Sequence, residues 1–535
     1  MVDLTERPRG TLLAAILVGS VARLSYLRRS LERLSREVVA SDAFYYFVLA
    51  RRIAAGEGVV FNTGVPTNGF HPLYAAVLVP IYELLPGFGP PLRAAVAIGA
   101  AVSVLTAVPI YLLGAELRSE TAGLVGALCW LLNPFVIDLS VLGMEVPFQV
   151  FFAAAFSWFA VSRSLTDPGR GTVCQWVVAG VLLGFAFLGR MDMAMLAVGF
   201  FGVVAVGLFR GATQLRNLTG PIIGGTTATA VITPWLAWSL TTVGRLTPAS
   251  GAALRWELRS YPERYGSYLD TVAVAALATG EDVWSYFLHV EPGTYLGKAA
   301  VSLLALVLLA SLVASVRRSD ELRSFVGRVD FFVVTGVLYY AFYVFYQTDV
   351  RGWYALFTTF LLTVLVAVGV DATRTWSGIG RERLARAVIV SLLLSGAVSV
   401  GVQTVGGEHD EEHPRWTAAR YVGAELPEGT VVGSYNADIY QYYAPGVEVL
   451  NLDGLMNPEA LEARRDGRMA AYLCAEDAEY LLDPARDVAH LNRSREPVRE
   501  TDRRIDLRRV ETFGGADTTV YYLYRIESIE GCQTG

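Results

Sequence analysis

The most constraining feature of this 535-residue chain is a series of apolar runs, each close to the length that crosses a bilayer as a helix. Apolar residues make up 53% of the sequence and charged residues 18%, a composition unlike that of an ordinary soluble domain. We therefore expect a polytopic α-helical membrane protein. Eleven transmembrane helices are predicted, at residues 10–27, 92–114, 121–139, 145–165, 173–189, 192–209, 219–241, 297–316, 329–348, 352–372 and 387–405.

The distribution of arginine sets the expected orientation. A further apolar run at 73–86 is short for a crossing and lies between prolines, which favours an interfacial or re-entrant helix. If this run does not span and the N-terminus is cytoplasmic, most arginine-rich loops lie inside, as the positive-inside rule requires. Counting it as a span reverses the later loops. The arginine-rich first loop fits poorly in either orientation. We expect the first and second outer loops, the 242–296 loop and the C-terminal tail to be extracytoplasmic.

Composition changes abruptly near residue 405, which predicts two domains. Residues 1–405 form the membrane domain, and residues 406–535 form a tail with 25 Asp and Glu against 14 Arg. Such an acidic tail argues against binding to nucleic acid or to an anionic bilayer surface. The tail is predicted to be a small α/β domain, with strands at 430–435, 447–454, 507–514 and 518–527, a helix at 437–443 and helices over 458–483. NLDGLMN at 451–457 follows a strand, where it is either a ligand-binding or a structural turn.

The four cysteines give little sign of a metal site. Cys129 and Cys174 fall in apolar segments and are expected to be buried small side chains. Cys474 and Cys532 could pair outside the cell. The position of Cys532 near the end of the chain, where termini fray, weighs against that pairing.

The first outer loop concentrates unusual chemistry between residues 41 and 74. Asp42, Tyr45 and Tyr46 lie on one face of a predicted short interfacial helix, with a carboxylate at the edge of the bilayer. Asp42 could instead cap that helix, and the tyrosines could be ordinary membrane-belt residues. Asn68 and His71 lie in the turn before the apolar run at 73–86. Alternatively, this segment is only a structural turn, with a histidine at the membrane interface.

The second and third outer turns add further charges. Glu145 follows one predicted span and precedes Pro147 of the next, so it is either a catalytic carboxylate or a favourable charge at a helix N-terminus. Arg190 and Asp192 share a tight turn between two spans. A structural ion pair is the alternative there.

Two basic segments complete the set of candidates. Residues 245–255 are predicted to be a Pro/Ser/Gly loop in which Ser250 and Arg255 could bind phosphate oxygens. Arg351 and Tyr354 lie at a helix start, as a phosphate clamp or as part of an aromatic belt. All these candidates fall on one face of the predicted topology. Their chemistry suits group transfer from an anionic leaving group, with a carboxylate base and cations that hold the departing phosphate.

Five segments together resemble the membrane glycosyltransferases of the GT-C fold. They are SDAFYYFVLARRIAAGEG at 41–58, PTNGFHPLY at 66–74, GMEVP at 143–147, TPASGAALR at 247–255 and RGWY at 351–354. The similarity is closest to the polyprenyl-phosphate-sugar-dependent, dolichyl-phosphate-mannose mannosyltransferase-like group, and more distant to mycobacterial arabinofuranosyltransferases. Residues 433–457 resemble the outer domain of bacterial and archaeal members.

The resemblance implies a role for each matched residue. Asp42 would be the catalytic base, the polyprenyl phosphate would leave from the opposite side of the sugar, and the anomeric carbon would invert. Glu145 would orient donor or acceptor, and Arg351 and Arg255 would face phosphate. Relatives often have Asp-Asp where this chain has Ser41 and Asp42, and lysine where it has Arg255. With a single carboxylate there, we predict no divalent metal and no cofactor.

The sequence thus predicts a hexosyl- or pentosyltransferase in the cell membrane. The donor would be a polyprenyl-phosphate-linked sugar, and the acceptor a hydroxyl of a glycan, protein or lipid outside the cytoplasm. A multi-span transporter or lipid-linked sugar flippase is the main alternative, and broken mid-membrane helices would favour it. A non-catalytic scaffold follows if Asp42 is only a helix cap.

Overall fold

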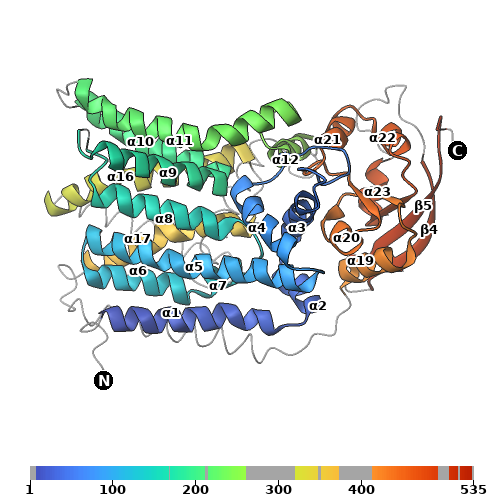
Figure 1. Ribbon diagram of the computed structural model, residues 1–535, viewed down its shortest axis with the longest axis horizontal. Helices are drawn as coiled ribbons and strands as arrows, with labels where there is room; N and C mark the ends of the chain where they lie inside the picture. Colours follow the sequence, from blue (N-terminus) through green and yellow to red (C-terminus); the bar gives the residue numbers. More distant parts are fainter. Residues whose placement is uncertain are drawn as a thin grey trace, which may run out of the picture.

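The computed structural model describes residues 8–167, 169–210, 215–260, 320–347, 351–372, 413–491, 505–515 and 518–532. A helical bundle forms one end of the molecule and a sheet-containing C-terminal domain forms the other (Figure 1). Between them lie three short helices: α3 (Ser41–Ala54), α4 (Pro72–Leu84) and α12 (Ala249–Ser260). The candidate site is built around this junction.

The bundle contains the long apolar helices. In chain order these are α1 (Pro8–Ser25), α5 (Gly89–Leu117), α6 (Glu120–Leu132), α7 (Pro134–Ser140), α8 (Val146–Ser162), α9 (Val173–Gly189), α10 (Ala194–Arg210), α11 (Thr219–Trp238), α16 (Asp320–Ala341) and α17 (Ala355–Ala372). Shorter helical turns connect them: η1 (Tyr26–Arg28), α2 (Leu31–Arg33), η2 (Leu34–Val38), η3 (Met191–Met193), η4 (Leu215–Leu218), η5 (Ser239–Val243), η6 (Phe342–Gln347) and η7 (Gly352–Tyr354).

Within the described residues, four helical stretches are long and apolar enough to cross a bilayer. They are Gly10–Arg28, Gly89–Leu117, Met191–Phe209 and Val329–Tyr346, and a bent pair could add a fifth. Other predicted spans correspond to helices that are shorter or less apolar, and those at 297–316 and 387–405 lie outside the described residues. The protein is a multi-pass membrane protein in outline. The predicted number of eleven spans stays a prediction.

The span predicted at 121–139 is not one continuous helix. It consists of α6 and α7, which meet at an angle of 58°. Pro134 has no N–H to donate, and Asn133 before it has an extended backbone (φ −70°, ψ 119°). The Asn133 side chain accepts a hydrogen bond from Phe135 N at 2.9 Å and so caps α7. Hydropathy alone could not reveal this bend, because the apolar run continues through it.

The C-terminal domain is a five-stranded mixed sheet with helices. Its strands are β1 (Val431–Ser434), β2 (Glu448–Asn451), β3 (Tyr480–Asp483), β4 (Ile505–Phe513) and β5 (Tyr521–Ile529), in the order β2-β1-β3-β5-β4. Strands β2, β1 and β3 are parallel, while β5 pairs antiparallel with β3 and β4. The helices are α19 (Pro414–Glu425), α20 (Ala437–Tyr443), α21 (Pro458–Arg465), α22 (Met469–Ala475) and α23 (Ala485–Leu491).

One strand of this sheet falls where only helices are predicted. Residues 458–483 contain α21 and α22, but they end in the strand β3. Its apolar run YLL is too short for its periodicity to distinguish a buried strand from the end of a helix. The other predicted strands and the helix at 437–443 are confirmed.

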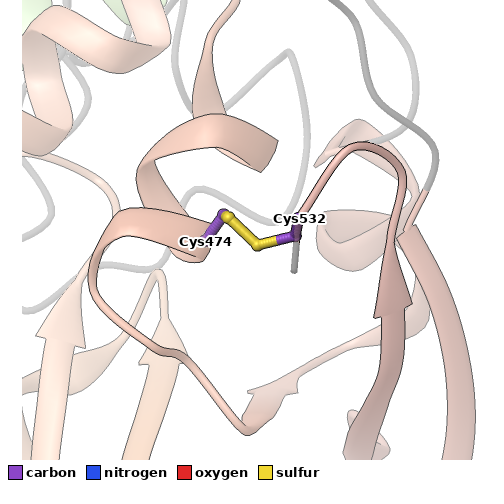
Figure 2. The surroundings of a disulfide bond; sticks show 2 residues. All are labelled: Cys474 and Cys532. Atoms are coloured by element: carbon purple, nitrogen blue, oxygen red, sulfur yellow. A yellow bond between two sulfur atoms is a disulfide. The ribbon is translucent and has the colours of Figure 1, made fainter. Parts of the chain in front are cut away.

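A disulfide joins Cys474 of α22 to Cys532, which follows β5 (Figure 2). The expectation that Cys532 is too frayed to pair is therefore wrong, because β5 holds the preceding residues in the sheet. Cys129 is buried as predicted, whereas Cys174 is exposed near the start of α9.

The C-terminal domain packs directly on helix α3. Residues 43–50 of α3 are all buried, between α4 on one side and α20 on the other. Phe44 of α3 contacts the rings of Tyr442 and Tyr443, with centroids 5.3 and 6.1 Å away. The C-terminal domain therefore covers this helix, and its predicted place at the membrane interface stays a prediction.

Candidate active site

Asp42 lies in the first turn of α3. The helix begins at Ser41 and its N-cap is Ala40, so Asp42 is not the cap. The carboxylate is half-buried, and burial raises its pKa from 3.8 to about 6. Arg351 acts on this group to lower the pKa, whereas Glu145 acts to raise it. The structure therefore places Asp42 within electrostatic reach of both residues.

Glu145 is fully buried at the N-cap of α8. Its Oε1 atom accepts a hydrogen bond from Arg190 Nη1 at 2.8 Å. Its Oε2 atom has no hydrogen-bond partner among the described residues. A buried carboxylate oxygen without a partner costs free energy, so Oε2 is a candidate acceptor for a substrate hydroxyl.

His71 lies beside Glu145 at the N-cap of α4. Its Nε2 atom is 3.8 Å from Glu145 Oε1, and its Nδ1 atom accepts from Met191 N at 3.4 Å. Burial lowers the pKa of His71, which favours the neutral ring. Because Nδ1 is an acceptor, the ring proton resides on Nε2 and faces the carboxylate.

Arg190 is the centre of a buried ion-pair network. Its Nε atom donates to Asp192 Oδ2 at 2.8 Å, and Nη2 donates to Tyr343 O–H at 3.1 Å. The guanidinium also stacks on the Tyr354 ring, 4.3 Å from its centroid. The alternative of a structural ion pair between Arg190 and Asp192 is thus present in the structure. The same network also holds Glu145.

The two adjacent tyrosines of α3 have different surroundings. The Tyr46 hydroxyl accepts from His71 N at 3.2 Å, so it belongs to the Glu145 side of the site. The Tyr45 hydroxyl donates to Asp453 Oδ2 at 3.2 Å and accepts from Asn451 Nδ2 at 3.0 Å. Tyr45 thus joins α3 to the end of β2.

Asn68 positions the start of α12. Its Oδ1 atom accepts from Ala249 N at 3.0 Å, and its Nδ2 atom donates to Ser239 Oγ at 2.6 Å and to Arg245 O at 3.2 Å. The predicted loop at 245–255 is wrong from Ala249 onward, because this cap starts a helix that contains Ser250. Binding of substrate by Asn68 and Ser250 stays a prediction.

The two candidate phosphate-binding arginines lie in different settings. Arg255 of α12 donates from Nη1 to the Tyr346 hydroxyl at 2.8 Å and stacks on that ring at 4.0 Å. Arg351 is exposed, and its charge acts on Asp42. Tyr354 lies three residues on, beneath Arg190. Of these two arginines, Arg351 is therefore the one whose charge is seen to act on the carboxylate of Asp42.

The structure also brings residues to the site that the sequence did not indicate. Arg415 and Asp438 of the C-terminal domain form an ion pair, and both charges act on Asp42. Gln149 of α8 donates from Nε2 to Asp192 Oδ1 at 2.9 Å. Gln149 is four residues after Glu145 on a predicted span, and a polar residue at that spacing could have indicated it. Nothing in the sequence connects Arg415 to the first outer loop.

No group of three or more His, Cys, Asp or Glu side chains suited to a metal ion occurs within the ranges that the structure describes. Asp42 and His71 each lie near Glu145, and Arg190 already pairs with the Glu145 carboxylate.

A family model described as dolichyl-phosphate-mannose-protein mannosyltransferase matches residues 71–238. The fold is that of GT-C membrane glycosyltransferases, as the sequence resemblance predicts. None of the curated proteins matches the chain in sequence.

Among the solved structures that it resembles are those of an archaeal oligosaccharyltransferase, AglB from Archaeoglobus fulgidus. One is a complex with an inhibitory peptide and a dolichol-phosphate; it is 13% identical, with a TM-score of 0.51 over 88% of this chain and 69% of that chain. A complex with Zn and sulfate has the same identity and TM-score, over 88% and 67%. A third, tethered to an acceptor peptide containing the NVT sequon, is 12% identical with a TM-score of 0.51, over 90% and 70%.

Proposed function

We propose that this protein is an inverting glycosyltransferase of the cell membrane. It transfers a monosaccharide from a polyprenyl phosphate donor to a hydroxyl of a glycan, protein or lipid acceptor. The observation that carries the proposal is the position of Asp42 at the start of α3, near both Arg351 and Glu145. A carboxylate base beside a cation matches the charge that this transfer develops.

In the proposed reaction, Asp42 and Arg351 each have one role. The Asp42 carboxylate accepts the proton of the acceptor hydroxyl while that oxygen forms a bond to the anomeric carbon. The bond from this carbon to the phosphate oxygen breaks, and the electron pair leaves with the polyprenyl phosphate. Arg351 stabilises the negative charge of the departing phosphate. Attack opposite to the leaving group inverts the anomeric carbon.

Glu145 orients the acceptor in this proposal. Its partnerless Oε2 accepts a hydrogen bond from a sugar hydroxyl, while Arg190 holds Oε1 in place. The dolichol-phosphate in the similar archaeal structure supports a lipid-phosphate donor. The peptides in those structures support, by analogy, a protein acceptor among the three acceptor classes.

The disulfide supports an extracytoplasmic site. Disulfides persist in oxidising compartments, and the Cys474–Cys532 pair belongs to the domain that packs on α3. In this proposal the C-terminal domain and Asp42 therefore lie outside the cytoplasm, and the N-terminus lies inside.

The test compares sugar transfer by the wild-type protein and the Asp42→Asn variant in the same membranes, with labelled polyprenyl-phosphate sugars. We expect Asp42→Asn to lower transfer by at least about 10²-fold, because the amide cannot accept the proton. The matched control is Asp167→Asn, which removes an exposed carboxylate paired with Arg170. Equal transfer by the wild-type and Asp42→Asn proteins would refute the role of Asp42.

One observation favours the second candidate, a lipid-linked sugar flippase. The bend between α6 and α7 is a broken helix of the kind found in transporters. A flippase would move a labelled lipid-linked sugar between leaflets without forming a glycosylated product. Flipping by the Asp42→Asn variant at the wild-type rate, with no product from either protein, would favour this second function.

A further inference from the structure

The bend between α6 and α7 leaves the backbone carbonyl of Leu131 in need of a donor. In a continuous helix, the N–H of Phe135 would bond to the carbonyl of Leu131. Here Phe135 N instead donates to the Asn133 side chain, so the Leu131 carbonyl is released within the bundle. A buried carbonyl in a membrane helix must find another donor.

Arg23 of the first helix supplies that donor. Its Nη1 atom donates to Leu131 O at 2.9 Å and to Gly19 O at 3.0 Å. The side chain is fully buried, and its Nε and Nη2 atoms have no hydrogen-bond partner among the described residues. Helices α1 and α6 lie close together here, as shown by the 3.1 Å that would separate a Cβ atom on Gly19 from Leu131 O. A fully buried guanidinium is costly, and at this site it stabilises the bend.

The first helical segment also holds the other side of the bend. Tyr26, directly after α1, donates a hydrogen bond from its hydroxyl to Asp138 Oδ1 of α7. Arg23 therefore binds the end of α6, and Tyr26 binds α7. These two residues together fix the direction in which the chain leaves the bend.

The chain that leaves the bend leads directly to Glu145. Within this turn, Leu142 O accepts from Ala40 N at 3.0 Å, and Gly143 O accepts from the Tyr74 hydroxyl at 2.6 Å. Gly143 has φ +71°, which glycine adopts without strain. Because Ala40 is the N-cap of α3, this turn connects the positions of Glu145 and Asp42.

We propose that Arg23 and Tyr26 are positioning residues, which fix the α6–α7 bend and thereby set the position of Glu145 relative to Asp42. The inference rests on the proposed function for the roles of these two carboxylates. The geometric part, however, can be tested without measuring sugar transfer.

The first experiment measures the contact between residues 40 and 142. Ala40→Cys and Leu142→Cys are introduced together in a chain that also carries Cys129→Ala and Cys174→Ala. Residues joined by a backbone hydrogen bond are close enough for a disulfide. Mild oxidation should join the two cysteines and so protect both thiols from a maleimide-linked polymer.

We expect Arg23→Met to slow this cross-linking at least fivefold, and Arg23→Lys to restore it. Arg28→Met, which removes an exposed charge from the same helix end, should have no effect. Cross-linking of Arg23→Met at the unmodified rate would overturn the proposal.

The second experiment separates positioning from stability. We expect Arg23→Met and Tyr26→Phe to lower kcat by about 10–100-fold per folded molecule, with the donor KM changed less than about twofold. If Arg23→Met does not fold, the kinetics of Tyr26→Phe alone provide this test. An unchanged kcat in folded Tyr26→Phe protein contradicts the proposal. If the wild-type protein transfers no sugar, the proposed function fails, and the cross-linking still decides the geometric part.

Discussion

At the scale of single residues, the site contains more buried acid than buried base. Arg190 faces both Glu145 and Asp192 and binds each through a different nitrogen atom. Only a guanidinium presents enough donors in a fixed plane to hold two carboxylates and a tyrosine hydroxyl. The arginine thus holds the Glu145 carboxylate in position.

We therefore expect Arg190→Met to destabilise the protein by about 3–5 kcal/mol, since it leaves two buried carboxylates without their cation. Arg190→Lys should retain part of the stability but lose transfer activity, because one ammonium group cannot reproduce the planar contacts. Thermal unfolding in detergent measures the first effect. Arg170→Met is the matched control, and it should change stability by less than about 0.5 kcal/mol, because that residue is exposed. A stable, fully active Arg190→Met protein would rule out this role.

The charged residues of the site could be predicted from the sequence better than the residues that they contact. The positions of Asp42, Glu145, Arg190 and Arg351 at span ends were visible in the sequence, because charges are rare in such a chain. Their contacts could not be predicted, since Tyr343 is over 150 residues from Arg190 and no sequence pattern connects them.

At the scale of secondary-structure elements, α3 is held from outside by the C-terminal domain. Arg52 donates to Glu448 Oε2 of β2 at 2.8 Å, and Asn62 donates to Glu448 Oε1 at 2.8 Å. Arg51 donates to the carbonyls of Gln441 and Tyr442 at the end of α20. The position of the helix that carries Asp42 therefore depends on the position of the C-terminal sheet.

Glu448→Gln should weaken this contact by about 1–3 kcal/mol, because buried Arg52 loses the nearer of its two charged acceptors, Glu448 and Glu57. Burial alone would raise the pKa of Glu448, but Arg52 and hydrogen bonds from Asn62 and Thr63 lower it. A lowered pKa stabilises the folded state above the unfolded pKa of about 4.5, and the contribution is lost as the pH falls below it. The thermal stability of the wild-type protein should therefore fall as the pH drops below about 4.5. The thermal stability of the Glu448→Gln variant should fall less over the same pH range. A variant with the same acid sensitivity as wild type would contradict this.

Elements with clear local signals could be predicted closely, and the others could not. The helix at 437–443 has its predicted bounds because a turn precedes it and an Ala-Pro-Gly sequence follows it. Helix α12 was missed because its cap comes from Asn68, about 180 residues earlier in the chain. The break in α6–α7 does have a local signal, Asn133 before Pro134, but a hydropathy count does not register it.

At the scale of the whole molecule, part of the C-terminal domain shares a hydrophobic core with the bundle, while the rest of that domain has a core of its own. Buried residues of α3 and α20 belong to the same continuous cluster, together with Val432 of β1. The two composition-defined parts are therefore in extensive contact where the structure describes them. Contacts across about 400 residues of sequence leave no local pattern, so this packing could not be predicted.

The sidedness of the protein can be tested through its cysteines. We expect Cys474 and Cys532 to resist an impermeant thiol reagent on intact cells until a reductant is added. Replacing both by alanine should destabilise the C-terminal domain by about 2–4 kcal/mol, because the bond closes a loop with a sequence separation of 58 residues. Modification of both thiols without a reductant, or only after the cells are lysed, would contradict the predicted outer location.

The pH dependence of kcat/KM tests the central claim, that Asp42 is the base, most directly. The pKa of about 6 in the free protein predicts that kcat/KM rises about tenfold per pH unit below pH 6 and is constant above it, since only the ionised carboxylate accepts a proton. The residual activity of Asp42→Asn should lack this acid limb. A wild-type profile that is flat from pH 4.5 to 8, or an acid limb that persists unchanged in Asp42→Asn, would contradict the assignment of Asp42 as the base.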